Sequence, residues 1–346
     1  MAYSSIVKPG DYFEATTYTG GATDVSSLSF QPDFVWAKKR SGSENHGLFD
    51  AVRGATKTLS SNDTAAESTR GGSLTSFDSD GWSMGGSDGI ISASGSTYVG
   101  WAWKAGTTGS GTTTGSGTGK AYSYSVNTTA GFSIIKYDGN STAGHTIPHH
   151  LGAVPKIIIV KSTELTESWA VHVGALNDPE KILFLNGTDA GTNASTSFNT
   201  TTPTSSVFTL GSSDRTNASN GENIAYCFAE KTGYSKFGTY VGNGSSDGIF
   251  VYTGFKPAFL MIKASSFAGT DWQMYDSKRN TNNYLRANVS NAEAVGDDID
   301  FLSNGFKIRT SSGVINNNDH QNIYMAFAEE PLVANSGTDG VPATAR

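Results

Sequence analysis

Short apolar runs, separated by polar turns, follow one another along most of this chain. The runs are four to eight residues long and are bounded by Gly, Asn, Ser and Asp. Runs of that length with such borders predict β-strands joined by tight turns. Apart from one helical turn near residues 177–181, no segment shows the period of an amphipathic helix. The pattern therefore predicts an all-β protein.

One apolar run recurs three times, and each time a proline precedes it and a lysine stands six residues after that proline. The pairs are Pro32 and Lys38, Pro155 and Lys161, and Pro257 and Lys263. Because proline lacks an N–H group, it is tolerated better at the start of a strand than in its middle. Each run therefore predicts a buried strand with a proline at its start.

The residues around these strands recur in the same order. A tryptophan follows the lysine in the second and third copies, Trp169 and Trp272, and the first copy has His46 in its place. The first and third copies share an Asp and an Arg three residues apart, at 50 and 53 and at 276 and 279. Each copy closes with an aromatic-rich strand, at 98–103, 224–230 and 323–329. The chain therefore consists of three divergent copies of one domain.

These copies divide the chain into repeat 1 (residues 1–104), repeat 2 (121–232) and repeat 3 (233–332). Residues 107–119 contain only Gly, Ser and Thr, so the segment 105–120 is predicted to be a flexible linker. No such linker separates repeats 2 and 3, which we expect to form a rigid pair. The end, 333–346, has the composition of a flexible tail. Three tandem antiparallel β-sandwich domains of the jelly-roll or lectin-like kind, each with its own core, fit repeats of this size.

Composition narrows the classes of function. Charged residues make up 16% of the chain, the net charge is −7, and no block of Lys or Arg occurs. Nucleic-acid binding needs a basic face that displaces counterions from phosphates, so we expect no nucleic-acid partner. No stretch reaches the roughly 20 apolar residues of a membrane span, so we expect no membrane insertion. The first residues lack an apolar core of signal-peptide length, which predicts folding in a cytoplasm.

No group of residues has the pattern of a catalytic or metal site. The four histidines between residues 145 and 172 lack the converging spacing of zinc ligands. The acidic run at 297–300 has no counterpart in repeat 2, which argues against a glycosidase carboxylate pair. The single cysteine, Cys227, lies in an apolar strand and leaves no disulfide within the chain. We therefore expect no enzyme activity, no metal and no cofactor.

Aromatic and arginine side chains provide the best binding candidates. Most tryptophans fall at repeated strand positions, where filling the core explains them. One Asn-rich segment of repeat 3 differs, because it is predicted to be a surface loop and carries two tyrosines and two arginines. Side chains of these types are common at contacts with partners. The ligand-binding candidates are therefore Tyr275, Arg279, Tyr284 and Arg286.

Several segments resemble a known family. They are residues 204–213, 224–263, 300–307 and 342–346, and they include Ala-Tyr-Cys-Phe-Ala-Glu at 225–230. Together they look like a repeated domain of uncharacterised function in virion proteins of tailed phages, especially marine and cyanobacterial phages. Such proteins are often labelled tail-fibre-like or lectin-like. The resemblance covers repeats 2 and 3 closely and repeat 1 loosely, and it supplies no catalytic residues.

The resemblance implies a structural protein of the virion, assembled in the host cytoplasm. Its partners would be other virion proteins and a glycan or protein of the host surface, and a homo-oligomer such as a trimer is expected. A tail fibre or appendage that attaches to the host is the first interpretation. A capsid decoration or head-fibre protein is the second, and a polysaccharide depolymerase is the third.

Repeat 1 is the most divergent copy. It carries a basic run, Lys38, Lys39 and Arg40, where the other copies have a single lysine. We hypothesise that these three residues contact the virion and that repeat 1 lies proximal to it. Repeats 2 and 3 would then swing outward on the linker.

Overall fold

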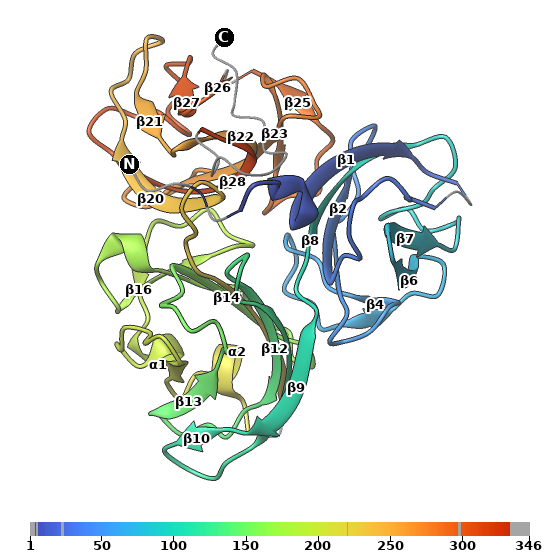
Figure 1. Cartoon of the computed structure of the whole chain (residues 1–346). Helices are drawn as coiled ribbons and strands as arrows, with labels where there is room; N and C mark the ends of the chain where they lie inside the picture. Colours follow the sequence, from blue (N-terminus) through green and yellow to red (C-terminus); the bar gives the residue numbers. More distant parts are fainter. Residues whose placement is uncertain (1–3, 5, 22–23, 220, 297–298, 333–346) are drawn as a thin grey trace.

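The computed structural model describes residues 4–332 except 5, 22–23, 220 and 297–298. Nearly all of its regular structure is antiparallel β-strand, which confirms the all-β prediction. The chain forms three lobes around a common centre, one lobe for each repeat (Figure 1). Short helical turns occur at Pro9–Asp11 (η1), Gly174–Leu176 (η2), Ser195–Phe198 (α1) and Asp214–Asn217 (α2). Of these, η2 lies just before the helical turn expected near 177–181.

Each lobe contains one main sheet, and its strands follow the same spatial order. In repeat 1 the order is β1 (Phe13–Thr19), β8 (Thr97–Trp103), β2 (Phe34–Lys39) and β3 (Gly47–Asp50). In repeat 3 it is β20 (Ser235–Val241), β28 (Gln321–Pro331), β22 (Phe255–Ala264), β23 (Gln273–Asp276), β24 (Asn283–Arg286) and β25 (Ala294–Val295). In repeat 2 it is β12 (Phe132–Asp138), β19 (Glu222–Phe228), β14 (Ile157–Ser162), β15 (Ala170–Val173), β16 (Lys181–Phe184) and β17 (Thr192–Asn193). Two more strands, β11 (Ala121–Asn127) and β9 (Thr107–Thr112), extend this last sheet beyond β12.

A smaller sheet covers the outer face of each main sheet. It consists of β6 (Leu74–Asp78) and β7 (Gly81–Met84) in repeat 1, of β10 (Thr114–Gly115), β13 (His145–Pro148) and β18 (Val207–Leu210) in repeat 2, and of β21 (Phe250–Tyr252), β27 (Gly305–Ile308) and β26 (Ile299–Leu302) in repeat 3. One further pair, β4 (Lys57–Thr58) and β5 (Ser68–Thr69), follows β3. An apolar cluster fills the space between the two sheets of each lobe. Each lobe is therefore built like a small sandwich.

The buried strands predicted beside the three prolines are β2, β14 and β22. Pro32 and Pro155 precede their strands as expected, whereas β22 begins at Phe255 and Pro257 lies within it, at a register shift. Residues 34–38, 157–162 and 257–264 are all buried. One face of each strand packs on the smaller sheet, and the other face turns to the centre of the molecule. A strand covered on both faces reads as a continuous apolar run rather than an alternating one, which is the pattern seen in the sequence.

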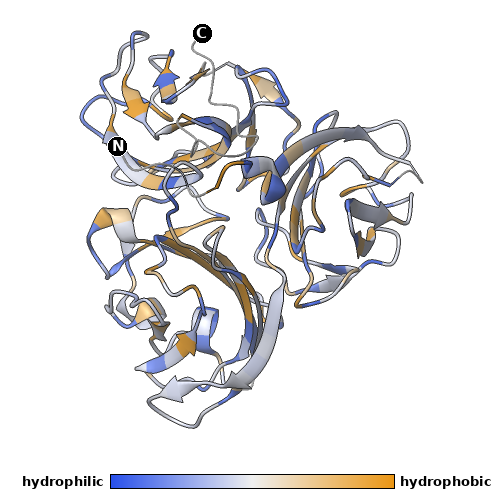
Figure 2. Cartoon of the chain, viewed as in Figure 1, coloured by the Kyte–Doolittle hydropathy of each residue, from blue (hydrophilic) through white to orange (hydrophobic). Residues whose placement is uncertain are grey.

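A single apolar core occupies the centre and receives side chains from all three repeats. Ring contacts join each pair of repeats: Phe34 with Tyr226, Phe228 with Phe327, and Phe259 with Trp103, at centroid distances of 4.4, 5.8 and 5.9 Å. Apolar residues gather on the main sheets, whereas many outer loops are polar (Figure 2). Each lobe thus has its own core between its two sheets, but the lobes are not independent, because the inner faces of the three main sheets bury one another in this additional shared core.

The segment predicted to be a flexible linker, residues 105–120, belongs to the sheets instead. β9 pairs with β11 along its whole length, and β10 pairs with β13. Gly109 and Gly111 lie directly opposite Tyr124 and Tyr122, and a Cβ on either glycine would come within 3 Å of the facing tyrosine ring. The rings therefore cover the glycines and supply the packing that glycine lacks.

The lobes close around the centre rather than follow one another in a row (Figure 1). With the linker forming strands and the core shared, repeats 2 and 3 have no hinge on which to swing away from repeat 1. The hypothesis that repeats 2 and 3 swing outward on a linker is therefore wrong, whereas the placement of repeat 1 next to the virion stays a prediction. The expected tail, 333–346, lies outside the described residues.

Because the core is shared, we predict that the lobes unfold in one cooperative transition. Phe259→Ala removes a ring that touches repeats 1 and 3, and a large-to-small change of this kind costs about 3–5 kcal/mol. In urea denaturation, tryptophan fluorescence and far-UV circular dichroism should report the same decrease in the free energy of unfolding. Val295→Ala, at a residue 70% exposed, is the control and should change little. Two transitions, of which the substitution moves only one, would contradict a shared core.

Candidate functional site

Polar groups at equivalent positions link each repeat to the next. Three ring nitrogens bond to a backbone carbonyl oxygen of the neighbouring repeat: Trp169 Nε1 to Ser60 at 2.9 Å, Trp272 Nε1 to Phe184 at 2.9 Å, and His46 Nε2 to Arg286 at 3.0 Å. Donors and acceptors occupy matching places in the three repeats. These bonds therefore run from repeat 2 to 1, from 3 to 2 and from 1 to 3, and close a ring.

His46 makes the bond that tryptophan makes in the other two repeats. Its Nδ1 accepts a hydrogen bond from Trp36 Nε1 at 2.9 Å, so its Nε2 carries the proton and donates to Arg286. Burial, together with the charge of Lys38, lowers the pKa of His46 to about 3. The ring is therefore neutral at ordinary pH, and the divergence of repeat 1 at this position preserves the interface.

A second ring of hydrogen bonds joins backbone groups. The amide nitrogens of Glu67, Gly191 and Glu293 donate to the carbonyl oxygens of Thr163, Ser265 and Arg40, at 2.7, 2.7 and 3.1 Å. Here the bonds run from repeat 1 to 2, from 2 to 3 and from 3 to 1. Each repeat is thus bonded to both of its neighbours in two independent ways.

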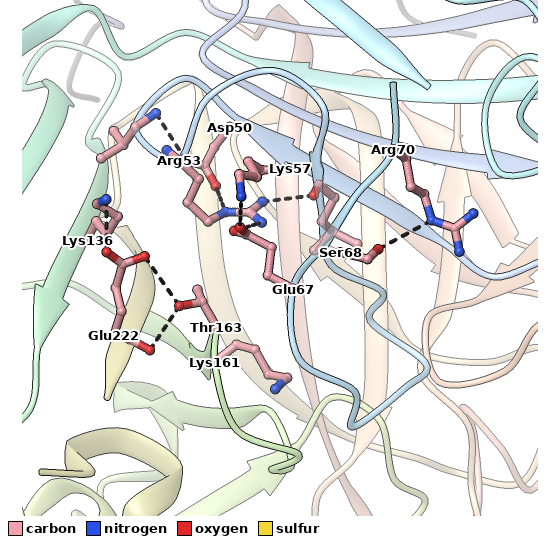
Figure 3. Close-up of polar contacts among 12 residues, drawn as sticks. Asp50, Arg53, Lys57, Glu67, Ser68, Arg70, Lys136, Lys161, Thr163 and Glu222 are labelled. Atoms are coloured by element: carbon pink, nitrogen blue, oxygen red, sulfur yellow. Dashed lines mark hydrogen bonds and ion pairs between the residues drawn. The ribbon is translucent and has the colours of Figure 1, made fainter. Parts of the chain in front are cut away.

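The interface between repeats 1 and 2 buries a cluster of charged groups (Figure 3). Arg53 Nε lies 2.5 Å from Asp50 Oδ2, and Arg53 Nη1 lies 3.1 Å from Glu67 Oε2. Tyr226 of repeat 2 donates its hydroxyl proton to Asp50 at 2.8 Å. Burial alone would lower the pKa of Arg53, but the interactions with its partners, of which the charge of Asp50 is the largest, together outweigh burial and raise that pKa above its usual value. The cluster is therefore ion-paired and hydrogen-bonded inside the interface.

The interface between repeats 3 and 1 contains the same cluster. Arg279 lies 2.7 Å from Asp276 and 3.0 Å from Glu293, and Trp101 of repeat 1 donates its ring N–H to Asp276 at 3.0 Å. Arg40 of repeat 1 adds bonds of 2.9 and 3.0 Å to Glu293. Burial alone would raise the pKa of Glu293, but the two arginines outweigh burial and lower it.

The interface between repeats 2 and 3 is apolar at the same positions. Val173, Leu176 and Gly191 stand where the other repeats have Asp, Arg and Glu. Met325 stands in β28 where the other two interfaces have their aromatic donor. Val173 and Met325 belong to the central core, and Leu176 packs against it. A buried charge without a partner costs several kcal/mol. Where repeat 2 lacks the acidic acceptor, repeat 3 therefore also lacks the aromatic donor.

The three lysines that follow the prolines are buried. Lys38, Lys161 and Lys263 are 0% exposed, and each Nζ donates to the carbonyl oxygen of the next residue. Burial lowers the pKa of each lysine to about 8. Lysines with lowered pKa values occur at many active sites. Here, however, each ammonium group holds a strand end against backbone oxygens, which is a structural role.

The four residues predicted to bind a ligand do not form an exposed loop. Tyr275 is fully buried in β23, Tyr284 in β24 is 8% exposed, and Arg279 belongs to the charged cluster. Arg286 is half-buried, forms an ion pair with Asp271 at 3.4 Å and lies over the Tyr284 ring. The expected placement on a surface loop is therefore wrong for Tyr275, Arg279 and Tyr284, because strands carry the tyrosines inward and Arg279 pairs with Asp276.

The basic run predicted to contact the virion is also engaged within the molecule. Lys38 is buried, and Arg40 pairs with Glu293 of repeat 3. Lys39 is partly exposed. The hypothesis of a three-residue contact surface is therefore wrong for Lys38, and Arg40 already has its partner.

The remaining candidates for chemistry have structural surroundings. Among the described residues, no group of three or more His, Cys, Asp or Glu side chains could hold a metal ion. Burial lowers the pKa of both His149 and His172 to about 4 and raises that of the Cys227 thiol. Asp297 and Asp298 lie outside the described residues. No helix within the described part of the chain has the length and apolar character to cross a bilayer.

A surface pocket of about 240 Å³ lies where repeats 2 and 3 join. Glu230, Lys236 and Tyr252 are among the residues that line it. Glu230 and Lys236 form an ion pair at 2.7 Å, and Tyr252 is 54% exposed. An exposed aromatic ring beside hydrogen-bonding groups has the chemistry of a contact with a sugar or a peptide.

The sequence contains one signal for the charged clusters. An Asp followed three residues later by an Arg occurs in repeats 1 and 3 and is absent from repeat 2. Spacing alone does not show that these side chains meet the next repeat, because that contact depends on how the lobes close.

Comparison with known protein families gives a match over nearly the whole chain. A family model described as a domain of unknown function, DUF7483, matches residues 8–331. No curated protein and no solved structure matches the chain. The match spans all three repeats, so the whole ring, rather than one lobe, corresponds to the family's domain.

We predict that Asp50, Arg53 and Tyr226 at the interface between repeats 1 and 2 are replaceable only together; Glu67 keeps its ion pair with Lys57, at 3.2 Å. Arg53→Leu leaves Asp50 buried without its cation and should cost about 3–5 kcal/mol of unfolding free energy. Asp50→Val, Arg53→Leu and Tyr226→Met together copy the apolar interface between repeats 2 and 3. In urea denaturation this triple variant should be more stable than Arg53→Leu alone. A triple variant that is the less stable of the two would refute the interpretation.

We also predict that the buried lysines make stability depend on pH. The pKa of Lys263 is about 8 in the folded chain and ordinarily 10.5, so between these values the unfolded chain binds more protons. Stability contributed at this site therefore rises with pH. The difference in urea midpoint between the natural chain and Lys263→Met should shift in favour of the natural chain from about pH 7.5 to about pH 9.5. A constant difference over that range would count against a buried, neutralising lysine.

Proposed function

We propose that this chain, which belongs to the DUF7483 family, is a non-enzymatic structural protein of a tailed-phage particle. Within the particle it is a component of a tail fibre or appendage that attaches to the host surface. The resemblance of residues 204–213, 224–263 and 300–307 to repeated domains of phage virion proteins supports this assignment. These segments contain β18, β20 and β21 and most of β19, β22, β26 and β27, and thus parts of the sheets of two lobes.

The geometric observation that carries the proposal is the closed ring of three repeats within one chain. The shared core and the two rings of hydrogen bonds hold the lobes in one arrangement. Turns rich in Gly, Ser, Thr and Asn surround this core. A scaffold that is ordered before it binds loses little entropy on binding, which suits attachment to a surface.

The groups with the most perturbed chemistry support a structural role. His46 and the three buried lysines have lowered pKa values, and each of them is bonded to a backbone carbonyl oxygen. Arg53 is bonded to two carboxylates. These contacts hold strands and lobes together, so the perturbed groups are accounted for without a substrate.

Within this proposal a host glycan binds at the pocket beside Tyr252. The exposed ring can stack on the apolar face of a sugar, while Glu230 and Lys236 offer an acceptor and a donor for its hydroxyl groups. The threefold arrangement expected of an oligomer is already provided by the three repeats of one chain.

A second candidate is a capsid decoration or head-fibre protein. The feature that favours it is the approximate threefold relation of the lobes, which repeats the same interface positions three times. A body of this kind matches a threefold-symmetric position of a capsid lattice.

Mass spectrometry of purified particles, combined with antibody labelling of the chain in electron micrographs, tests the proposal. We expect few copies per particle, with the label on the tail. Copies in proportion to the major capsid protein, with label over the head, would identify a decoration protein. Absence from purified particles would contradict both assignments, and release of soluble sugar from host envelopes by the chain would identify a depolymerase.

A further inference from the structure

Repeat 2 carries two strands that the other repeats lack. β11 and β9 continue its main sheet beyond β12, whereas the main sheets of repeats 1 and 3 end at the matching strands β1 and β20. β9 contributes no side chain to any of the apolar clusters, and its residues are almost all exposed. Core packing therefore does not account for β9. What β9 provides is a new sheet edge, on the flank of the lobe (Figure 1).

The backbone of β9 presents hydrogen-bonding groups at this edge. Thr113 N donates to Lys120 O at 2.8 Å. Because alternate residues of an antiparallel strand bond to the same neighbour, this bond shows which residues of β9 direct their backbone groups toward β11. Residues 107, 109 and 111 bond to β11, so the N–H and C=O groups of Thr108, Ser110 and Thr112 point away from it. Among the described residues no strand pairs with that side of β9.

Nothing in the sequence of β9 protects the edge. Exposed edges usually carry a charge, a proline or a bulge that hinders the addition of another strand. β1 carries Glu14 and β20 carries Lys236. β9 has neither a charged residue nor a proline, and its register with β11 has no bulge. The edge is therefore open to strand addition.

We propose that a second copy of this chain adds to the free edge of β9, antiparallel, with Ser110 at the twofold axis. The strand is self-complementary in this arrangement, because Thr108 of one copy lies opposite Thr112 of the other. The outward groups of the two strands then form about six hydrogen bonds. Cross-strand threonine pairs are favourable, and no like charges oppose the contact. The two eight-stranded sheets become one continuous sheet.

The contact involves a single strand from each copy, so its area is small and the dimer is weak in free solution. The dimer becomes stronger where another attachment already holds two copies side by side, because the β9 edges then meet at a high effective concentration. The proposal rests on the edge itself and holds whether the chain belongs to a tail, a head or neither.

Sedimentation of the full chain at concentrations from about 10 µM to about 1 mM, which bracket the affinity expected of such an interface, tests the proposal. The mean mass of the natural chain should rise toward twice the monomer mass. Ser110→Lys places two like charges opposite each other, and Ser110→Pro removes the central outward N–H, so both variants should stay monomeric. Ser110→Ala keeps the backbone groups and should dimerise as the natural chain does.

Unchanged far-UV circular dichroism and melting temperature show that each variant keeps its fold; if Ser110→Pro does not, Ser110→Lys decides alone. A natural chain that stays monomeric over the whole range overturns the proposal. A dimer that forms equally well with Ser110→Lys also overturns it, because the copies must then meet elsewhere.

Discussion

Burial of one apolar core by three sheets is the constraint on which the rest of the structure depends. The central strands β2, β14 and β22 are buried on both faces, and the smaller sheet of each lobe covers only the outer one. A sheet with an apolar inner face must pack that face against another layer. The inner faces of the other two main sheets provide this layer for each lobe. The repeats therefore close into a ring, and the same positions meet at every interface.

At those repeated positions the chain uses two physical solutions. Two interfaces bury an ion-paired Asp, Arg and Glu cluster with an aromatic donor, and the third is built from Val173, Leu176 and Met325. Buried charges are tolerated only as complete sets. A lobe packed against the wrong neighbour would place Met325 against a buried carboxylate that needs a donor. The difference between the interfaces therefore favours the observed order of the lobes over a permuted one.

The sequence predicts local structure better than it predicts contacts between lobes. The strands after the prolines follow from continuous apolar runs, but those runs do not say which face meets another repeat. The sequence does not predict β9, because its Gly, Ser and Thr composition is that of a linker, and Tyr122 and Tyr124, which cover its glycines, come from another strand. The Asn-rich turns around Tyr275 and Tyr284 predict a surface loop, whereas strand pairing carries both tyrosines inward.

Native-state hydrogen exchange tests most directly whether the three repeats are one folding unit. If one core holds the ring, the slowest amides of β8, β19 and β28 must open with the same free energy and the same dependence on denaturant, because opening any lobe exposes the core of all three. Slow amides in one repeat that open at a lower free energy, while those of the other two remain protected, would contradict this account.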